Sequence, residues 1–392
     1  MKTGILRSKV GKMIDVNKKV LSMTVVLCTL FSCSSDNSQR NPRQALTYES
    51  LEIEAKRVCL EPDVYVAGSE EGVAILWKNG IELYKLGKNI VANSVFVVDN
   101  DVYVAGVGGF EYDIYYSGSE RLSSLKKSNA MLWKNGVLQN LIVGDHISYA
   151  NSVFVYGNDV YVAGYESIPT GEYNRIHRSD VLTPDYWRIA KLWKNGIAQN
   201  LSSEKFNRLT STWGVAANSI YISENDVYVS GIKDGIATLW KNGMAQSLMN
   251  ERDEPFYAFV TSVFVSDNDV YVAVMEEWGI SLWKNGKTQN IDDIGWEYDN
   301  CSVFVSGKDV YIAGTSSDHE DGSTYAWLWK NGTVQDLTNW YDESLGRASS
   351  LFVSGNDVYV VGSKLWKNGE IQKLPDGRDH PGGNSIFVVE RK

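Results

Sequence analysis

Two stretches of the chain combine aromatic rings with guanidinium groups, a pattern suited to ligand binding. They span residues 107–129 and 165–189. An aromatic ring can stack on a sugar, while arginine and tyrosine bond its hydroxyls or line a peptide groove. The candidate ligand-binding residues are Tyr112, Tyr115, Tyr116, Tyr173, Arg175, Tyr186, Trp187 and Arg188. The alternative for each residue is that its ring packs only against its own loop.

Candidates for catalysis or metal binding are less well defined. A glycosidase or polysaccharide lyase would need two carboxylates a few ångströms apart. The candidate acids are Glu111, Glu172, Glu254, Glu297 and Asp342. The sequence alone cannot place any two of them near each other. The histidines are His146, His177, His319 and His380, and no two of them have the sequence spacing of metal ligands. The sequence therefore predicts no catalytic residue, no metal and no cofactor.

The elements that carry these residues belong to a repeat of about 40 residues that is lengthened by insertions. Each unit reads Ser-Val-Phe-Val, a turn, Asp-Val-Tyr-Val-Ala-Gly, a variable stretch, Leu-Trp-Lys-Asn-Gly and a short final segment. The apolar runs, rich in β-branched and aromatic residues, predict four strands per unit. Asn-Gly is typical of a type I′ turn and predicts a tight hairpin between the third and fourth strands.

The central strands have apolar residues on both faces, so each sheet must be covered on both sides. Four-stranded sheets stacked around an axis form a β-propeller, whereas a solenoid is the alternative. Residues 384–389 copy the first strand of the unit, but no second strand follows them. We therefore expect an all-β fold over residues 56–392, a seven-bladed β-propeller of four-stranded antiparallel blades, closed by the C-terminal strand. The repeated tryptophans are expected to pack between blades; they are Trp77, Trp133, Trp193, Trp240, Trp283, Trp329 and Trp366.

The order of these strands and turns resembles kelch-type and related bacterial seven-bladed propeller repeats over about residues 57–389. This resemblance implies a fold and no particular activity, since propellers serve as enzymes, adhesins and scaffolds.

The N-terminus is typical of a secretory signal. Lys18 and Lys19 precede an apolar run from Val20 to Phe31, which is too short for an ordinary membrane span. The following Ser32 and Cys33 complete a segment that resembles the lipobox of bacterial lipoproteins, which implies cleavage before Cys33 and lipidation of its thiol. We expect a signal peptide at residues 1–32, a polar tether at 33–55 and a lipid-anchored protein of the bacterial cell envelope. A plain signal and an uncleaved anchor are the alternatives.

The net charge limits the kinds of binding partner, and the cysteine content bears on disulfide bonds. Without residues 1–32 the chain keeps 32 basic and 47 acidic residues, a net charge of −15. This charge argues against nucleic acid as a partner. Cys59 and Cys301 are expected to be too far apart for a disulfide, and we expect a monomer.

Connection lengths indicate where a ligand would bind. In an antiparallel meander, the short turns of all units lie on one face of the disc, here called the tight-turn face. All insertions fall on the opposite, variable-loop face, and variable loops on a rigid scaffold commonly form binding sites. We therefore expect an envelope protein that captures an extracellular glycan or protein on the variable-loop face. A carbohydrate-active enzyme on that face and a scaffold of an envelope complex are the alternatives.

Overall fold

The computed structural model describes residues 61–391, apart from gaps at 118–119, 140, 142–143, 176–181, 207–213, 251, 253, 256–257, 277–278, 292–296, 318–322, 339–345 and 381. The backbone alone is described for residues 113–117, 120–124, 173–175, 182–185, 203–206, 290 and 297–299. Residues 63–389 form one compact unit. The predicted signal peptide, tether and Cys33 lie outside the described residues, as does Cys59.

The described residues form strands and turns in six sheets. Five sheets have four antiparallel strands each. The first has the order β28 (Gly383–Val389), β1 (Asp63–Glu70), β2 (Val73–Lys78), β3 (Ile81–Lys88). The next two are β12 (Ala216–Ser223), β13 (Asp226–Lys233), β14 (Ile236–Lys241), β15 (Met244–Ser247), and β16 (Phe259–Ser266), β17 (Asp269–Glu276), β18 (Gly279–Lys284), β19 (Lys287–Ile291). The last two are β20 (Glu297–Ser306), β21 (Asp309–Ser317), β22 (Thr324–Lys330), β23 (Thr333–Asp336), and β24 (Ala348–Ser354), β25 (Asp357–Gly362), β26 (Leu365–Lys367), β27 (Glu370–Ile371).

The sixth sheet has eight strands because the first strand of one antiparallel meander pairs with the third strand of another. One meander contains β4 (Ile90–Val98), β5 (Asp101–Ser117), β6 (Glu120–Lys134) and β7 (Val137–Gln139). The other contains β8 (Ile147–Tyr156), β9 (Asp159–Arg175), β10 (Leu182–Lys194) and β11 (Ile197–Phe206). A single parallel bridge, Ser128 with Ile147, joins them. Buried Ser148 strengthens this junction, since its Oγ accepts the N–H of Ala130 at 2.9 Å.

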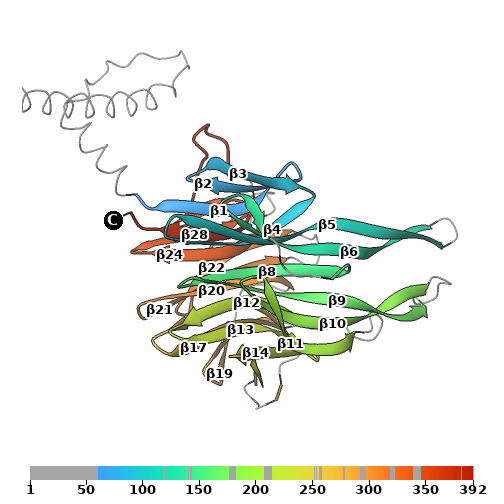
Figure 1. The fold of residues 1–392 in the computed structure, drawn as a ribbon. Helices are drawn as coiled ribbons and strands as arrows, with labels where there is room; N and C mark the ends of the chain where they lie inside the picture. The colour runs from blue at the N-terminus through green and yellow to red at the C-terminus, as the bar shows by residue number, and fades with distance from the viewer. Residues whose placement is uncertain are drawn as a thin grey trace, which may run out of the picture. The chain divides into compact units, whose positions relative to one another are not determined.

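The sheets are arranged as a β-propeller (Figure 1). The first strand of each meander is innermost, because it packs against the first strands of the neighbouring meanders. An aromatic ring from each inner strand contacts the ring of the next strand, with centroids 4.6–5.1 Å apart. The rings follow the cycle Phe96, Phe154, Tyr221, Phe264, Phe304, Phe352, Phe387 and back to Phe96. The prediction of an all-β propeller with four-stranded antiparallel sheets is confirmed. In the described residues, no helix is long and apolar enough to cross a membrane.

The tryptophan of every Leu-Trp-Lys-Asn-Gly copy is buried, as expected for residues that pack between sheets. Trp193 of β10, for example, belongs to a cluster with Tyr103 and Leu132 of the preceding meander. The Asn-Gly turns are also confirmed. Both residues of each turn have positive φ, as in Asn79 (52°) and Gly80 (74°), which a type I′ turn requires.

The two repeated motifs bind each other through what we call the clasp. In the clasp of β13 and β14, Asp226 accepts hydrogen bonds from Lys241 Nζ at 2.6 Å and from Asn242 Nδ2 at 2.8 Å. Asn242 Oδ1 accepts the N–H of Val227 at 2.9 Å, and Lys241 Nζ lies 5.1 Å from the Tyr228 ring centroid. The hydrogen bond from Lys241 holds the pKa of Asp226 below its ordinary value.

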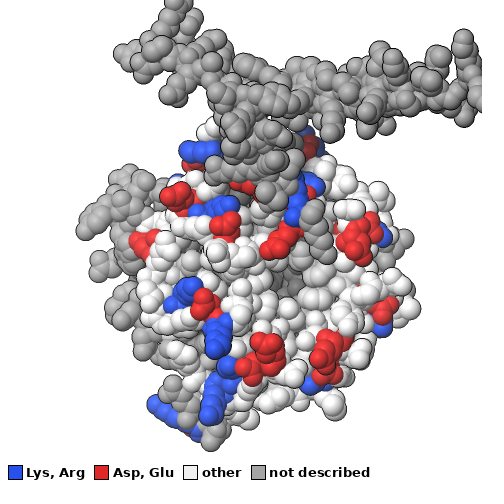
Figure 2. All heavy atoms as spheres, turned by 90° about the vertical axis from the view of Figure 1, so that its left-hand side faces the viewer, with Lys and Arg blue, Asp and Glu red and all other residues white. Residues whose placement is uncertain are grey.

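The same clasp recurs in every meander, with lysine–aspartate distances of 2.6–2.9 Å. All clasps lie on the tight-turn face, where acidic and basic side chains occur in neighbouring groups (Figure 2). The repeated lysine and aspartate are thus used to hold the second and third strands together, so the repeat motifs have a structural role.

The longest insertions differ from the loops that we expected. The described residues within 107–129 and 165–189 continue the strands β5, β6, β9 and β10, which form two long hairpins that project from the variable-loop face (Figure 1). The expectation of loops is therefore wrong for these two insertions. The backbone pairing simply continues beyond the sheet, as far as Ser117 with Glu120 in one hairpin and Arg175 with Leu182 in the other.

Candidate functional site

A cavity of about 900 Å³ lies among the inner strands, near the end at which these strands begin, on the side of the variable-loop face. Its lining includes two consecutive residues near the start of each inner strand, as in Asn93-Ser94 of β4 and Asn151-Ser152 of β8. The contacting aromatic rings come two residues later, at Phe96 and Phe154, and therefore lie on the tight-turn side of this polar layer. The cavity is thus a cup with a polar wall, and we call the ring of contacting aromatic side chains on its tight-turn side the aromatic floor.

The first residue of each pair, as at Asn93 and Asn151, lies in a β-bulge. The pairing of β4 with β5 skips Asn93, and the pairing of β8 with β9 skips Asn151. A bulged residue is unpaired, and a bulge can redirect a side chain. Glycine on the neighbouring strand provides the space, because a Cβ on Gly106 would lie 2.2 Å from the carbonyl oxygen of Val91. The glycine that ends the Asp-Val-Tyr-Val-Ala-Gly motif therefore helps to shape the cup.

The serines link the inner strands to one another. Ser94 Oγ accepts the N–H of Val153 at 3.1 Å, and Ser219 Oγ accepts the N–H of Val263 at 3.2 Å. Ser385 of the C-terminal strand accepts the N–H of Val95 in the same way at 3.1 Å. These bonds fix the spacing of the inner strands and hence the width of the cup.

The rim is aromatic on the β8–β9 side. The rings of Tyr149 and Tyr165 are stacked, with centroids 4.9 Å apart and planes inclined by 10°. The guanidinium carbon of Arg188 lies 4.7 Å from the centroid of Tyr165, and its Nε donates to Ser167 Oγ at 3.3 Å. Burial raises the pKa values of both tyrosines, so their hydroxyls stay protonated near neutral pH. Phe110, Phe259 and Met275 add further apolar surface to the cavity lining.

The cup has no charged side chain among the described residues that line it. Its functional groups are amides, hydroxyls and the thiol of Cys301. That thiol lies 2.9 Å from Thr261 Oγ1, and burial raises its pKa to about 12. A protonated, buried thiol is a poor nucleophile, so the cup is suited to hydrogen bonding and stacking rather than to covalent chemistry.

The predicted ligand-binding residues are not brought together in this cup. Tyr112 is 57% exposed on its hairpin, whereas Tyr186 is only 7% exposed and its hydroxyl lies 3.5 Å from the Leu125 carbonyl oxygen. Trp187 is 45% exposed and, because successive strand residues point to opposite faces, it points away from Arg188. Arg188 alone of the described candidates reaches the rim, through Tyr165. The side chains of Tyr115, Tyr116, Tyr173 and Arg175 lie outside the described residues.

The candidate acids and histidines also stay apart from the cup, as far as they are described. Glu111, Glu172 and Glu254 are exposed and do not line the cavity. His380 is buried against Trp77, with ring centroids 5.2 Å apart, and His146 is half-buried in the connection before β8. Within the described ranges no group of three His, Cys, Asp or Glu side chains could hold a metal. The side chains of Glu297 and Asp342 and the residues His177 and His319 lie outside the described set.

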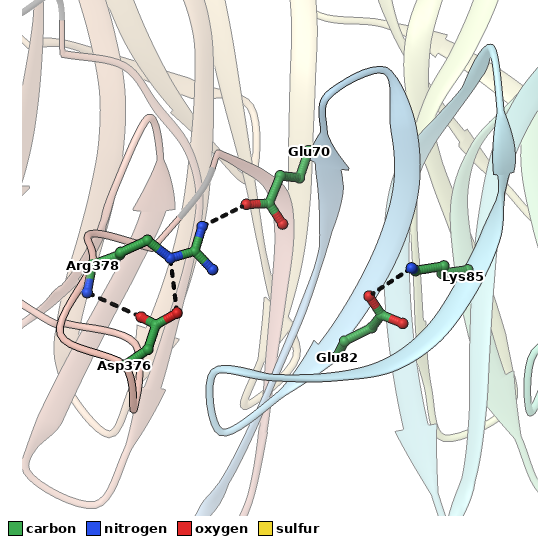
Figure 3. Close-up of polar contacts among 5 residues, drawn as sticks. All are labelled: Glu70, Glu82, Lys85, Asp376 and Arg378. Carbon is green, nitrogen blue, oxygen red and sulfur yellow. Dashed lines mark hydrogen bonds and ion pairs between the residues drawn. The ribbon is translucent and has the colours of Figure 1, made fainter. Parts of the chain in front are cut away.

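Arg378 illustrates how polar residues of the connections are used. Its guanidinium group donates to Glu70 Oε1 at 3.1 Å and to Asp376 Oδ2 at 2.8 Å, whereas Glu82 and Lys85 pair with each other on β3 (Figure 3). Arg378 therefore ties the connection between β27 and β28 to the end of β1. This ion pair supports the position of β28 and lies outside the cup lining.

Sequence reasoning missed the Asn and Ser residues that line the cup. In the sequence they precede an apolar run and look like an ordinary strand start. A signal was nevertheless present: the serine is the same in every copy, whereas the residue before it varies. A position that varies among otherwise uniform repeats is free from the packing that fixes its neighbours.

Comparisons with known proteins give distant similarities of fold. No family model and no curated protein matches the chain. Among solved structures, the β-propeller domain of the trilobed protease from Pyrococcus furiosus is 13% identical, with a TM-score of 0.36, over 72% of this chain and 79% of that one. An acylaminoacyl peptidase from Pyrococcus horikoshii is 15% identical, with a TM-score of 0.33, over 74% of this chain and 47% of that one.

A mutant of Trypanosoma rangeli sialidase displaying trans-sialidase activity is 11% identical, with a TM-score of 0.40, over 83% of this chain and 57% of that one. The chain thus spans about half the length of the peptidase and of the sialidase. Similarity at this level does not transfer an activity to this chain.

Proposed function

We propose that this chain is a lipid-anchored protein of the bacterial cell envelope whose propeller binds an extracellular glycan or protein ligand in the cup. The observation that carries this proposal is the lining of the cup, where amides and hydroxyls lie beside the aromatic side chains of Phe110, Tyr149 and Tyr165, with no charged side chain among the described residues. Binding pockets combine apolar surface with a few oriented polar groups, and this cup has both.

We further propose that the propeller is a single closed ring of seven kelch-like blades and acts as a monomer. Three contacts of β28 support closure: it pairs with β1, Asn384 Nδ2 donates to the carbonyl oxygen of Ala92 at 2.9 Å, and Ser385 bonds Val95. The C-terminal strand thus bridges the first and second meanders. A closed ring would hold the cup rigid, which lowers the entropic cost of binding.

A carbohydrate-active enzyme is the second candidate function. The residues that line the cup distinguish it from a binding protein. Most glycosidases use two carboxylates about 5–10 Å apart. The described lining contributes neither aspartate nor glutamate, so catalysis would need acids from outside that lining. Release of reducing sugar from oligosaccharides by the full chain would favour the enzyme, whereas capture without turnover favours the binding protein.

Blocking the cup tests the proposed site. Asn300 lies at the rim on β20 and is exposed, so Asn300→Trp should fill part of the cavity without disturbing the core. A glycan array and a pull-down from envelope extract first identify the ligand. We expect Asn300→Trp to weaken its binding by about tenfold or more, the scale of a steric block that costs over 1.4 kcal/mol. Lys287→Trp, which adds the same ring at an exposed position on β19, is the matched control. Unchanged binding by Asn300→Trp would place the site elsewhere.

The anchor can be tested independently of the ligand. If Cys33 is lipidated, metabolic labelling with palmitate should mark the wild-type protein and should not mark Cys33→Ser. The substituted protein should also leave the membrane fraction. Equal labelling and equal membrane association of both proteins would contradict the lipoprotein assignment.

A further inference from the structure

One position of the cup wall differs between strands although its neighbours do not. Each inner strand contributes two consecutive residues to the cup wall. The second of the two is always a serine: Ser385, Ser94, Ser152, Ser219, Ser262, Ser302 and Ser350. The position before it is asparagine in four strands that are consecutive around the axis: β28, β4, β8 and β12. In β16, β20 and β24 it is Thr261, Cys301 and Ser349. We call Asn384, Asn93, Asn151 and Asn218 the asparagine arc.

The asparagine arc forms a continuous polar wall. Each Nδ2 donates to a backbone carbonyl of the next inner strand: Asn93 to Ala150 at 2.9 Å, Asn151 to Ala217 at 3.0 Å, Asn218 to Val260 at 2.7 Å and Asn384 to Ala92 at 2.9 Å. Each such bond uses one of the two N–H groups of the amide, and Asn151 Nδ2 also donates to Asn218 Oδ1 at 3.4 Å, which links two members of the arc. The wall therefore keeps further neutral donors and acceptors at the cavity surface.

Packing of the sheets does not explain why the amides occur on one side only. β16 and β24 have their bulges at Thr261 and Ser349, so the same bulge forms without asparagine. Those strands pair with their neighbours in the same antiparallel register. An amide is thus compatible with the fold but not required by it, and its restriction to one arc points to a ligand.

We propose that the asparagine arc determines specificity and that the ligand is a neutral oligosaccharide, whose terminal unit lies off the axis against this arc. The inference rests on the proposed binding function of the cup. Amides can donate to and accept from sugar hydroxyls, while Tyr149 and Phe110 supply nearby apolar surface for the C–H face of the ring. An acidic sugar would bring a carboxylate to a wall without a charged side chain, which is unfavourable. Arg188 lies outside the described lining, where its guanidinium group stacks on Tyr165 and donates to Ser167.

Direct binding measurements on the full chain test this inference. The probes are gluco-, manno- and xylo-oligosaccharides, compared with galacturonic acid oligomers of equal length. We expect at least one neutral series to bind and the acidic series to bind about tenfold more weakly or not at all, since a buried unpaired charge is costly. Asn151→Ser and Asn218→Ser should each weaken neutral binding by about three- to tenfold, the effect of losing one or two hydrogen bonds.

The chain supplies a matched control for these substitutions. Serine already occupies the equivalent bulge of β24, so Asn151→Ser should preserve the fold, which the melting temperature checks. The reverse change, Ser349→Asn, adds an amide outside the arc and should leave affinity within about twofold, a difference smaller than one hydrogen bond.

The possible failures have different meanings. Equal or tighter binding of the acidic oligomers would overturn the inference, as would a loss with Ser349→Asn as large as that with Asn151→Ser. If no neutral oligosaccharide binds but a protein ligand is captured and Asn300→Trp blocks it, the inference fails while the proposed function stands. If Asn300→Trp affects no ligand, the proposed function fails as well.

Discussion

Deletion of residues 383–392 should leave a chain that is largely unfolded, or that melts at least about 10 °C below the parent. The deletion removes β28, which pairs with β1 and buries Ile386 and Val388 in a cluster with Val66 and Trp77. Complete burial of an aliphatic or phenylalanine side chain contributes about 1.5–3 kcal/mol. Loss of buried Ile386 and Val388, together with half-buried Phe387, therefore removes a large part of the total stability of a typical domain, about 5–15 kcal/mol.

The deletion also breaks contacts that no other strand replaces. Phe387 lies between Phe352 and Phe96 in the aromatic floor, and the unpaired edge of β1 would be exposed. Thermal unfolding followed by circular dichroism measures the effect. Deletion of residues 391–392, which follow β28, is the control and should leave the melting temperature unchanged. A parent-like melting temperature after the longer deletion would show that the propeller does not depend on β28.

The sequence predicted the strands because each is encoded locally. Apolar runs, Asn-Gly turns and the repeat spacing identify the sheets without any knowledge of neighbours, and the positive φ values of Asn79 and Gly80 confirm the turns. The clasp was not predicted, although both of its motifs were recognised. Asp226 meets Lys241 only through the register of β13 and β14, which places Tyr228 opposite Lys241. Register depends on the complete sheet and cannot be read from either motif alone.

The binding site was harder to predict because side-chain direction decides it. Tyr186, Trp187 and Arg188 are adjacent in the sequence and were expected to share a surface. In a strand, alternate residues face opposite sides, which separates exposed Trp187 from Arg188. The cup depends on residues that are distant in the sequence, such as Asn384 and Asn93, and on bulges that redirect their side chains. Only the packing of the inner strands against one another brings these residues together.

Two tryptophans on strand β10 should respond very differently to removal of their rings. Trp193 has 0% of its surface exposed and packs with Tyr103, Leu132 and Val162, so it joins two meanders. Replacement by alanine leaves a large cavity, and such substitutions cost about 3–5 kcal/mol. Trp193→Ala should therefore lower the urea midpoint strongly or prevent folding.

Trp187 provides the control within the same strand, because it is 45% exposed. Trp187→Ala should cost less than about 1 kcal/mol, as substitutions away from the core usually do. If ligand binding depends on the hairpins as well as on the cup, Trp187→Ala will weaken binding while the urea midpoint stays near the parent value. A small loss of stability in Trp193→Ala, or equal losses in the two variants, would contradict the assignment of the repeated tryptophan to packing between sheets. The seven copies would then need another explanation, and a role in ligand binding would become the leading one.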